Sequence, residues 1–508
     1  MGKAAPGWSI LDAINDPNVF GSAFRDRRSW ESWFSFLAAL FGLPLTEAQA
    51  QTFTQATGRA QPPSTPSSES WLVVGRRGGK SFILALTAVF LAAFKDWKPF
   101  LGPGERATIM IIAADRKQAR TILRYVRGLL HLVPMLSQLI ENERAEAIDL
   151  DNRVTIEVHT ASFRTVRGYT VVACLCDEIA FWPTEDSASP DTEVINAIRP
   201  AMATVPGALL LCASSPYSRK GALYDAYKRY FGHEGPVLVW QADSRTMNPS
   251  VPQSFIDAEM EKDPVSAEAE YGAQFRNDID TFISREAVEA VVNHGVLEYP
   301  PLQGRRFVAF VDPSGGSNDS FTLGIAHKNE DGIAVLDVLR ERRPPFSPEG
   351  VVSEFAELLK QYRITKVQGD RYAGEWPREQ FRKLGISYDP SASPKSDLYR
   401  EMLPLLNSGK VRLLNNKRMI AQLIGLERRT SRAGRDSIDH AQGGHDDLAN
   451  GAAGALVTAT KTKPQMRMGT IDFVGTGRVT WRDEESHRQL IQFVTVTEEE
   501  DLRQRGLL

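Results

Sequence analysis

Residues 71–81, WLVVGRRGGKS, predict a buried strand that runs directly into a loop able to hold phosphate. The apolar run WLVV is typical of a strand covered on both faces, and the glycines after it let backbone N–H groups point at an anion. The helix expected from Ser81 would add its positive N-terminal end at the same place. In this pattern Lys80 would reach the β- and γ-phosphates of a nucleotide, and the Ser81 hydroxyl would ligate Mg²⁺.

The loop departs from the usual pattern GxxxxGK[ST], because Val74 stands where the first glycine is expected. By itself, such a loop could be an ordinary glycine-rich turn before a helix. The strand VVACLC, residues 171–176, favours a nucleotide site because two acids, Asp177 and Glu178, follow it. We expect Asp177 to hold Mg²⁺ through water and Glu178 to polarise the attacking water. Burying two acids costs desolvation energy that a purely structural role would seldom require.

Further polar residues are expected around the same nucleotide. The next apolar strand ends in CASSP, where the small hydroxyl residues Ser214 and Ser215 could sense the γ-phosphate. Arginines could neutralise charge that develops on that phosphate, or could be solvated surface residues. The candidate arginines are Arg76, Arg77 and Arg167, the last acting from a neighbouring subunit. The predicted nucleotide-binding set is Arg76, Arg77, Gly78, Gly79, Lys80, Ser81, Asp177, Ser214 and Ser215.

Acidic residues farther along the chain predict a metal-dependent cutting site. Asp312 closes the strand FVAFV, and Asp370 follows the strand VQG. Asp446 and Asp447 open a helix in GGHDDLANGAAGAL, whose small residues permit close packing on a sheet. Two-metal nuclease chemistry needs several carboxylates around a point about 4 Å across. Each aspartate alone could merely cap a turn or a helix, so the prediction depends on the whole set.

The predicted order of elements would bring these acids together. Three consecutive strands between residues 305 and 339 precede alternating helices and strands, which is the order of a ribonuclease-H-like (RuvC-like) sheet. In that topology the first and fourth strands are neighbours, and the final helix crosses above them. Asp319 is a further candidate beside the same site, and His445 could be a ligand or a base.

The alternation of helices and mostly apolar strands predicts two α/β domains, because 508 residues exceed what one core usually serves. We expect a P-loop ATPase with a mostly parallel sheet (ASCE/RecA-like), followed by a ribonuclease-H-like nuclease. The predicted divisions are an N-terminal helical segment at 1–65, an ATPase core with a helical linker or lid at 66–279, an interdomain linker and hinge at 280–304, the nuclease at 305–460, and a flexible or partner-bound tail at 461–508.

Composition sets limits on the class of protein. The net charge of −3 argues against a protein coated in positive charge but leaves a DNA enzyme possible, since acidic metal sites offset local basic patches. The apolar stretch at 82–94 is shorter than the roughly 20 residues that span a bilayer, and no signal-peptide pattern is evident, so we expect an intracellular soluble protein. Basic clusters at 417–435 and at 340–343 could follow DNA phosphates or be solvated faces.

These motifs, in this order, resemble those of the large terminase subunit of tailed bacteriophages. The resemblance covers about residues 15–460 and rests on GRRGGKS, RGYTVVACLCDE, SSP, VDPSGG, GDRYAGE and GHDDLANG. It implies a viral DNA-packaging motor, in which ATP hydrolysis drives double-stranded DNA into a procapsid. It also implies a two-metal endonuclease that cuts concatemeric DNA when packaging starts and ends. The implied cofactors are ATP and Mg²⁺, with Mn²⁺ possible at the nuclease site.

The resemblance also implies individual roles and partners. Arg76 would be the arginine of the phosphate loop, Arg167 the arginine acting in trans, and Glu178 the catalytic base. The nuclease ligands would be Asp312, Asp370 and Asp446 or Asp447, and the adenine-contacting glutamine could be Gln49, Gln51 or Gln55. The implied partners are double-stranded DNA, the portal protein, a small terminase subunit and further copies in a ring, by resemblance a pentamer, without a membrane. The implied location is the host cytoplasm and, transiently, the portal vertex of the procapsid, but not the mature virion.

Two other interpretations remain open at this point. A helicase-nuclease of DNA repair or restriction type would normally carry a second set of motor motifs, and the sequence contains only one recognisable ATPase core. A docking protein could instead use the nucleotide site as a conformational switch and the acids as structural groups.

Overall fold

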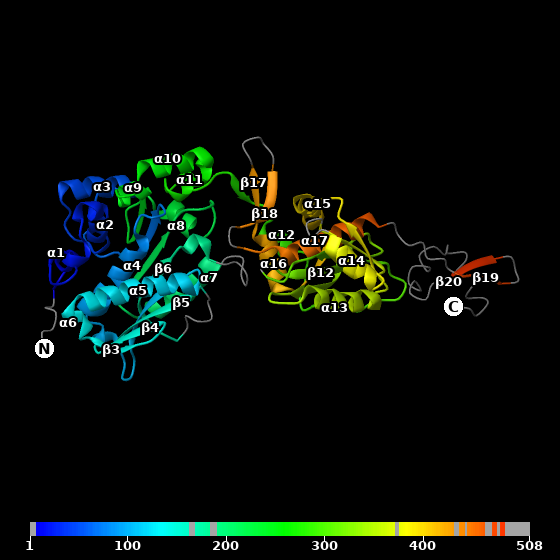
Figure 1. Ribbon diagram of the computed structural model, residues 1–508, viewed down its shortest axis with the longest axis horizontal. Helices are drawn as coiled ribbons and strands as arrows, with labels where there is room; N and C mark the ends of the chain where they lie inside the picture. Colours follow the sequence, from blue (N-terminus) through cyan, green and yellow to red (C-terminus); the bar gives the residue numbers. More distant parts are fainter. Residues whose placement is uncertain are drawn as a thin grey trace, which may run out of the picture.

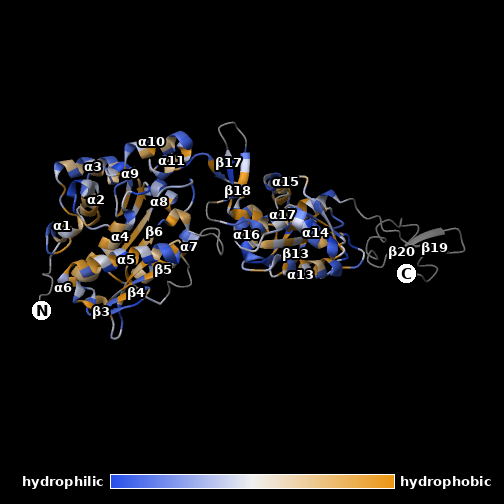
Figure 2. Ribbon diagram, viewed as in Figure 1, coloured by the Kyte–Doolittle hydropathy of each residue, from blue (hydrophilic) through white to orange (hydrophobic). Residues whose placement is uncertain are grey.

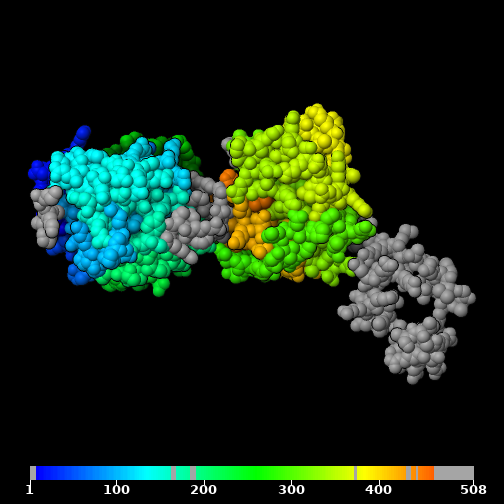
Figure 3. All heavy atoms as spheres, turned by 90° about the horizontal axis from the view of Figure 1, so that it is seen from below, coloured from blue at the N-terminus to red at the C-terminus, as the bar shows by residue number. Residues whose placement is uncertain are grey.

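The computed structural model describes residues 7–161, 168–182, 190–317, 319–370, 375–430, 436–441, 444–462, 470–474 and 478–482. Two lobes lie side by side along the long axis (Figures 1 and 3). We call the described residues up to 278 the N-terminal lobe and those from 279 to 462 the C-terminal lobe. Among the described residues, no helix combines the length and the apolar character that crossing a bilayer requires.

Within the described residues, an eight-stranded sheet forms the centre of the N-terminal lobe, in the order β3-β4-β5-β2-β6-β7-β1-β8. The parallel strands are β1 (Glu69–Val74), β2 (Ala107–Ala113), β5 (Val154–Thr160), β6 (Thr170–Asp177), β7 (Leu209–Ser214) and β8 (Val237–Ala242), and the antiparallel edge is β3 (Ile140–Glu143) and β4 (Ala147–Leu150). Because β7 lies between β1 and β6, the phosphate loop and Asp177 emerge at the same edge, one strand apart. The predicted mostly parallel sheet of a P-loop ATPase is confirmed.

Helices of the N-terminal lobe bury the apolar faces of this sheet. They are α1 (Ile10–Asn15), α2 (Glu31–Leu40), α3 (Glu47–Thr57), α4 (Lys80–Phe94), α5 (Arg116–Leu132), α6 (Pro134–Ser137), α7 (Pro190–Met202), α8 (Ala222–Tyr230), α9 (Ser244–Met247), α10 (Gln253–Lys262) and α11 (Pro264–Glu270). Every residue of α4 from Ile83 to Ala92 is buried, as expected of a helix that is apolar all round, and Figure 2 shows hydrophobic residues concentrated on α4 and the strands. Residues before β1 join this core, where Phe36 meets Trp240 of β8 edge-on.

The C-terminal lobe is built on a mixed sheet of seven strands in its described part, in the order β10-β16-β13-β12-β11-β14-β15. Its strands are β10 (Val292–Asn293), β11 (Phe307–Asp312), β12 (Phe321–Lys328), β13 (Ala334–Arg342), β14 (Lys366–Gly369), β15 (Ser387–Pro390) and β16 (Val411–Leu414). Strands β11, β12 and β13 are antiparallel, whereas β14 runs parallel to β11. The first and fourth strands are therefore neighbours, and the predicted ribonuclease-H-like fold is confirmed.

Other elements complete the C-terminal lobe. Its helices are α12 (Arg285–Glu289), α13 (Pro348–Gln361), α14 (Glu375–Lys383), α15 (Lys395–Asn407), α16 (Lys417–Ile424) and α17 (Asp447–Lys461). A small sheet pairs β18 (Asp436–His440), β17 (Leu426–Thr430) and β9 (Ile279–Thr281), and beyond this lobe β19 (Thr470–Val474) pairs with β20 (Arg478–Arg482). The stretch 280–304, predicted as an interdomain linker, contains α12 and β10 and contributes Ile283, Val288 and Val291 to the core of this lobe.

Helix α17 packs very close to the sheet because glycines of both the helix and β12 stand at the contact. A β-carbon at Gly454 would lie 2.2 Å from Phe310 Cγ, and one at Gly324 would lie 2.4 Å from the Gly451 carbonyl oxygen. Phe310 stands two residues before Asp312 on β11. The close approach of α17 therefore sets how near the acids at its N-terminus come to Asp312.

We predict that Gly454→Ala destabilises the C-terminal lobe by about 1–3 kcal/mol, because the added methyl group has no room against the Phe310 ring. The matched control is Gly128→Ala in α5, where a β-carbon meets nothing within 4 Å and the substitution should be neutral or slightly stabilising. Thermal unfolding of both variants checks this. Equal stability of the two variants would show that α17 does not depend on the glycine contact.

Candidate nucleotide and metal sites

The loop between β1 and α4 is held in a left-handed turn. Gly79 has φ 101° and Arg77 has φ 65°, the second being a conformation that costs energy for a residue with a side chain. A β-carbon at Gly75 would lie 2.4 Å from Ser244 Oγ, because the chain after β8 packs directly against the loop. The loop is therefore fixed by its neighbours, and the predicted glycines are needed for its path.

Lys80 is buried and held on the inner side of this loop. Its side-chain amine donates hydrogen bonds to the Val74 carbonyl oxygen (3.0 Å) and to Ser215 Oγ (2.9 Å), and lies 3.3 Å from Glu178 Oε1. The partners come from three different strand ends, β1, β6 and β7. The structure thus brings together the predicted lysine, acid and serine.

Asp177 lies fully buried at the end of β6, next to the start of α4. Its Oδ2 accepts hydrogen bonds from Ser81 Oγ (3.0 Å) and Gln118 Nε2 (3.2 Å), whereas its Oδ1 has no hydrogen-bond partner among the described residues. Burial and the neighbouring Glu178 raise the pKa of Asp177 to about 7, against the opposing effect of Lys80. An uncompensated carboxylate oxygen beside a serine hydroxyl fits a divalent cation.

Glu178 is oriented by the end of β7. Its Oε2 accepts hydrogen bonds from Ser214 Oγ (3.1 Å) and from the Ser215 backbone N–H (3.0 Å), and its backbone is left-handed with φ 48°. These contacts hold the carboxylate toward the phosphate loop. Ser214 and Ser215 therefore contact the predicted base, and their approach to a γ-phosphate stays a prediction.

The arginines predicted for this site have different positions. Arg76 and Arg77 both line a cavity of about 790 Å³ above the loop. The Arg76 guanidinium is largely exposed and pairs with Glu270 of α11 at 2.9 Å, and this hydrogen bond raises its pKa. Arg167 lies outside the described residues, so its role as an arginine acting in trans stays a prediction.

The predicted aspartates of the C-terminal lobe line one cavity of about 880 Å³. Its lining includes Asp312, Asp319, Asp370, Lys395, His440, His445, Asp446, Asp447 and Asn450. Asp312 ends β11, Asp370 follows the neighbouring β14, and Asp446 and Asp447 stand at the start of α17. Asp319 and His445 also line this cavity, with His445 Nδ1 lying 3.9 Å from Asp319 Oδ1.

Burial and neighbouring carboxylates raise the pKa of two aspartates in this cavity, Asp312 and Asp447. Removal from water, with further contributions from Asp447, Asp370 and Asp446, raises the pKa of Asp312 to about 8, although its Oδ2 accepts a hydrogen bond from Asn450 at 2.7 Å. Desolvation together with Asp446 raises the pKa of Asp447 to about 6, against a hydrogen bond from the Ser320 backbone. Carboxyl groups with such raised pKa values need a nearby positive charge to be ionised near neutral pH. The set therefore fits one or more divalent cations.

Asp446 differs from its neighbour because side chains of α15 contact it. Tyr399 donates to its Oδ2 at 2.8 Å, and Lys395 Nζ lies 3.0 Å from the same oxygen and 2.8 Å from Asp439 Oδ1. Burial alone would lower the pKa of Lys395, but Asp446 and Asp439 raise it. Ligand atoms of Asp439, His440 and Asp446 lie within 4.8 Å of one another.

The sequence predictions missed several residues of these sites. Gln118, Lys395, Asp439 and His440 were not predicted. Asp439 and His440 have a local sequence signal, because they form the DH pair that ends the polar strand DSIDH and the predicted acids also stand at strand ends. No such signal marks the other two residues. The other two stand in ordinary amphipathic helices, and only tertiary packing reveals them.

Most of the arginines predicted to follow DNA are paired within the C-terminal lobe. The pairs are Arg340–Glu298, Arg342–Glu354, Arg343–Glu341, Arg418–Glu341, Arg428–Asp436 and Arg429–Glu427. Arg432 and Arg435 lie outside the described residues. The charge of these clusters is therefore partly compensated, and DNA contact by them stays a prediction.

The fully buried Glu427 of β17 joins the two lobes. Tyr217 donates its hydroxyl to Glu427 Oε2 (2.9 Å), and Lys220 Nζ lies 2.9 Å from Oε1. Burial and the Glu427 charge raise the pKa of Tyr217 to about 12. Tyr217 stands two residues after Ser215, and the strand paired with β17 ends at His440, so this contact lies between the two cavities.

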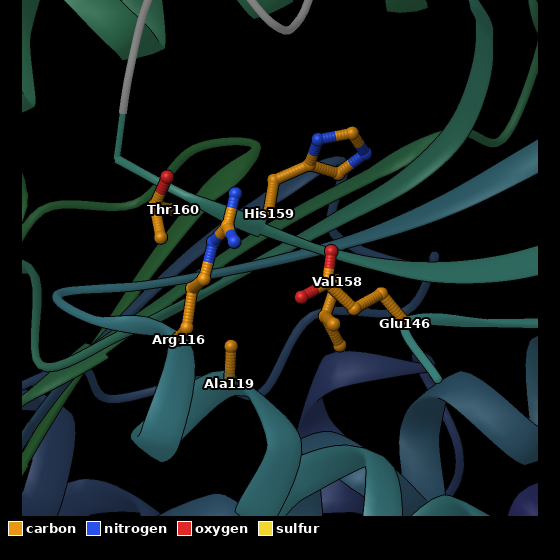
Figure 4. Close-up of a pocket in the computed structure, with 6 residues that line it drawn as sticks. All are labelled: Arg116, Ala119, Glu146, Val158, His159 and Thr160. Atoms are coloured by element: carbon orange, nitrogen blue, oxygen red, sulfur yellow. The ribbon is translucent and has the colours of Figure 1, made fainter. Parts of the chain in front are cut away.

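A smaller cavity of about 190 Å³ opens between β5 and the start of α5 (Figure 4). Arg116 extends into it toward Thr160, and its walls include Glu146 and His159. His159 pairs with Glu157 at 2.7 Å and Glu146 with Arg120 at 3.2 Å. None of the predicted site residues lines this cavity.

Residues 71–235 match the family model described as "Terminase large subunit, T4likevirus-type, N-terminal". No curated protein matches the chain in sequence. The large terminase of bacteriophage HK97 is 18% identical, with 78% of this chain and 91% of that chain covered and a TM-score of 0.35. The large terminase of a thermophilic bacteriophage, in complex with ADP, is 12% identical, with 78% and 94% covered and a TM-score of 0.34. The large terminase nuclease of the thermophilic phage G20c with bound magnesium is 19% identical, with 34% and 96% covered and a TM-score of 0.30.

The raised pKa of Asp312 predicts how stability depends on pH. Between about pH 4 and pH 8 the folded protein keeps a proton on Asp312 that the unfolded chain has lost, so stability in EDTA falls as the pH rises through this range. Asp312→Asn removes this pH-dependent loss of stability, so the variant should have a higher melting temperature than wild type at pH 8. The difference in melting temperature should shrink toward pH 5. Added Mg²⁺ should raise the melting temperature of wild type at pH 8 but have little effect on the variant.

Thermal melts at pH 5 to 8, with and without Mg²⁺, measure both effects. The control is Asp331→Asn, which changes an exposed turn residue and should follow wild type throughout. A wild type whose melting temperature is insensitive to both pH and Mg²⁺ would contradict the assignment of a metal site to Asp312.

Proposed function

We propose that this chain, whose residues 71–235 match the N-terminal domain of terminase large subunits, is the ATPase and nuclease of a viral DNA-packaging motor. ATP hydrolysis in the N-terminal lobe would drive double-stranded DNA into a procapsid. The C-terminal lobe would cut concatemeric DNA when packaging starts and ends. The observation that carries the proposal is that Asp312, Asp370, Asp446 and Asp447 line one cavity of a ribonuclease-H-like sheet in the same chain as the phosphate loop.

In the N-terminal lobe, the loop N–H groups and Lys80 would bind the β- and γ-phosphates of ATP. Glu178, oriented by its hydrogen bonds from β7, would accept a proton from the attacking water. Ser81 and Asp177 would hold Mg²⁺, which would neutralise phosphate charge. The contact of Ser215 with both Lys80 and Glu178 would report the state of the phosphates to the chain after β7.

In the C-terminal lobe, Asp312, Asp370 and Asp447 would hold Mg²⁺ or Mn²⁺. Bound in a pair, these ions would activate a water and steady the leaving oxygen of a phosphodiester. We assign the inner ligand at the start of α17 to Asp447, because Lys395 and Tyr399 already contact the carboxylate of Asp446. Lys395 would hold the Asp446 carboxylate in place beside the metal ligands.

The remaining parts of the proposal follow from the packaging role. The partners would be double-stranded DNA, the portal protein, a small terminase subunit and other copies in a ring, a pentamer, with Arg167 reaching the neighbouring nucleotide site. The protein would act in the host cytoplasm and transiently on the portal vertex of the procapsid, and would be absent from the mature virion. A helicase-nuclease would normally need a second motor domain, and the described residues contain one phosphate loop.

The two activities should separate by mutation. We predict that Glu178→Gln lowers DNA-stimulated ATP hydrolysis about 100-fold or more while plasmid cutting in Mn²⁺ persists, since Glu178 lies in the other lobe from the metal cavity. Asp312→Ala should abolish cutting and leave ATP hydrolysis intact. Colorimetric phosphate release and plasmid agarose gels measure the two reactions.

Asp331→Ala, at an exposed turn of the C-terminal lobe, serves as the control and should retain both activities. Wild-type cutting by Asp312→Ala would refute the nuclease assignment. Wild-type protein that never hydrolyses ATP, even with DNA and procapsids, would refute the motor.

A further inference from the structure

The cavity above the phosphate loop is lined by apolar residues as well as by the loop itself. Its lining includes loop residues 76–81 together with Val251, Pro252, Phe255 and Tyr271. Val251, Pro252, Phe255 and Tyr271 belong to the segment that carries α10 and α11, far from the loop in sequence, and the aromatic residues Phe82 of α4 and Tyr125 of α5 also line the cavity. The cavity therefore offers two chemically different surfaces to a single ligand.

The segment 244–271 is tied to the outer side of the loop by hydrogen bonds. Ser244 Oγ donates to the Arg76 carbonyl oxygen (2.6 Å), and Asn248 Nδ2 donates to the Arg77 carbonyl oxygen (2.8 Å). The Arg76 N–H donates in turn to the Glu270 carbonyl oxygen (2.5 Å), and their side chains form an ion pair. These hydrogen bonds thus fix the position of the apolar surface relative to the phosphate loop.

The same segment has a small core of its own that positions one exposed ring. Val251, Ile256, Ala267 and Tyr271 form this core. Phe255 lies at its margin, and its ring meets the Tyr271 ring edge-on, with centroids 5.3 Å apart and an interplanar angle of 84°. Phe255 is 42% exposed although it lines the cavity, so the ring retains surface for a further planar group.

We propose that Phe255 provides the stacking surface for the base of the nucleotide, in a slot completed by Pro252 and Tyr271. The inference rests on the proposed ATPase and deepens it by assigning the base-binding residues. A nucleotide pairs a charged triphosphate with a flat aromatic base, and this cavity joins a phosphate loop to an exposed aromatic ring. Stacking on an aromatic side chain suits any base, because every base presents a π-face.

The glutamines suggested by the sequence do not occupy this place. Gln49 caps the start of α3, where its Oε1 accepts a hydrogen bond from the Thr46 N–H at 3.0 Å. Gln51 and Gln55 lie on the same helix and are exposed. None of the three lines the cavity above the phosphate loop.

The test compares ligands with and without a base. Isothermal titration in Mg²⁺ would measure binding of the non-hydrolysable analogue AMP-PNP and of inorganic tripolyphosphate to the whole chain. We expect Phe255→Ala to weaken AMP-PNP binding about tenfold and to leave tripolyphosphate binding within twofold of wild type. Phe255→Trp should retain or strengthen AMP-PNP binding. The control is Phe100→Ala, which removes an equally exposed ring (41%) elsewhere in the N-terminal lobe and should change neither affinity.

Several outcomes would overturn the inference. Equal weakening of both ligands by Phe255→Ala would mean that the substitution disturbs the phosphate loop and that stacking contributes nothing. Unchanged AMP-PNP binding by Phe255→Ala, or a loss of binding by Phe255→Trp, would also contradict the slot. Equal affinity of wild type for the two ligands would refute base binding while the phosphate site stands. Failure of wild type to bind either ligand would refute the ATPase proposal itself.

Discussion

Both cavities depend on carboxylates that are buried away from water beside other acids. In the N-terminal lobe, Asp177 is fully buried, with Oδ2 bonded to Ser81 and Oδ1 lacking a hydrogen-bond partner among the described residues. In the C-terminal lobe, Asp312 shares its cavity with Asp447 and other aspartates, and its pKa rises to about 8. Both arrangements are costly without a cation, and each stands where neighbouring parallel strands end. The two sheets differ in topology, but each places several acids together at one edge.

Hydrogen bonds between the two lobes connect the regions around the two cavities. Ser215 touches Lys80 in the nucleotide site, and Tyr217, two residues later, donates to the buried Glu427 of the other lobe. Strand β17, which carries Glu427, pairs with the strand that ends at His440 in the metal cavity. Burying Glu427 without its partners would leave an uncompensated charge, so the lobes are expected to hold this junction firmly. A change at the phosphate loop thus has a short route to the cutting site.

Much of this architecture could be predicted because the decisive signals are local. An apolar strand that ends in Asp312, or in Asp177, marks a carboxylate at the edge of a sheet whatever the rest of the chain does. The partners that complete each site could not be predicted this way. Lys395 belongs to a helix with no metal-binding motif, and Arg76 pairs with a glutamate 194 residues away. The base slot at Phe255 likewise depends on how the segment after β8 folds back, which no sequence spacing encodes.

We infer that the acids at the end of β11 and the start of α17 form a divalent metal site. Anomalous diffraction at the manganese edge, from crystals of the whole chain soaked in Mn²⁺ near pH 8, tests it most directly. The structure predicts a peak at bonding distance from the Asp312 and Asp447 carboxylates, and its loss in Asp312→Asn crystals. Saturating Mn²⁺ that gives no peak between these carboxylates would contradict a metal site at this position.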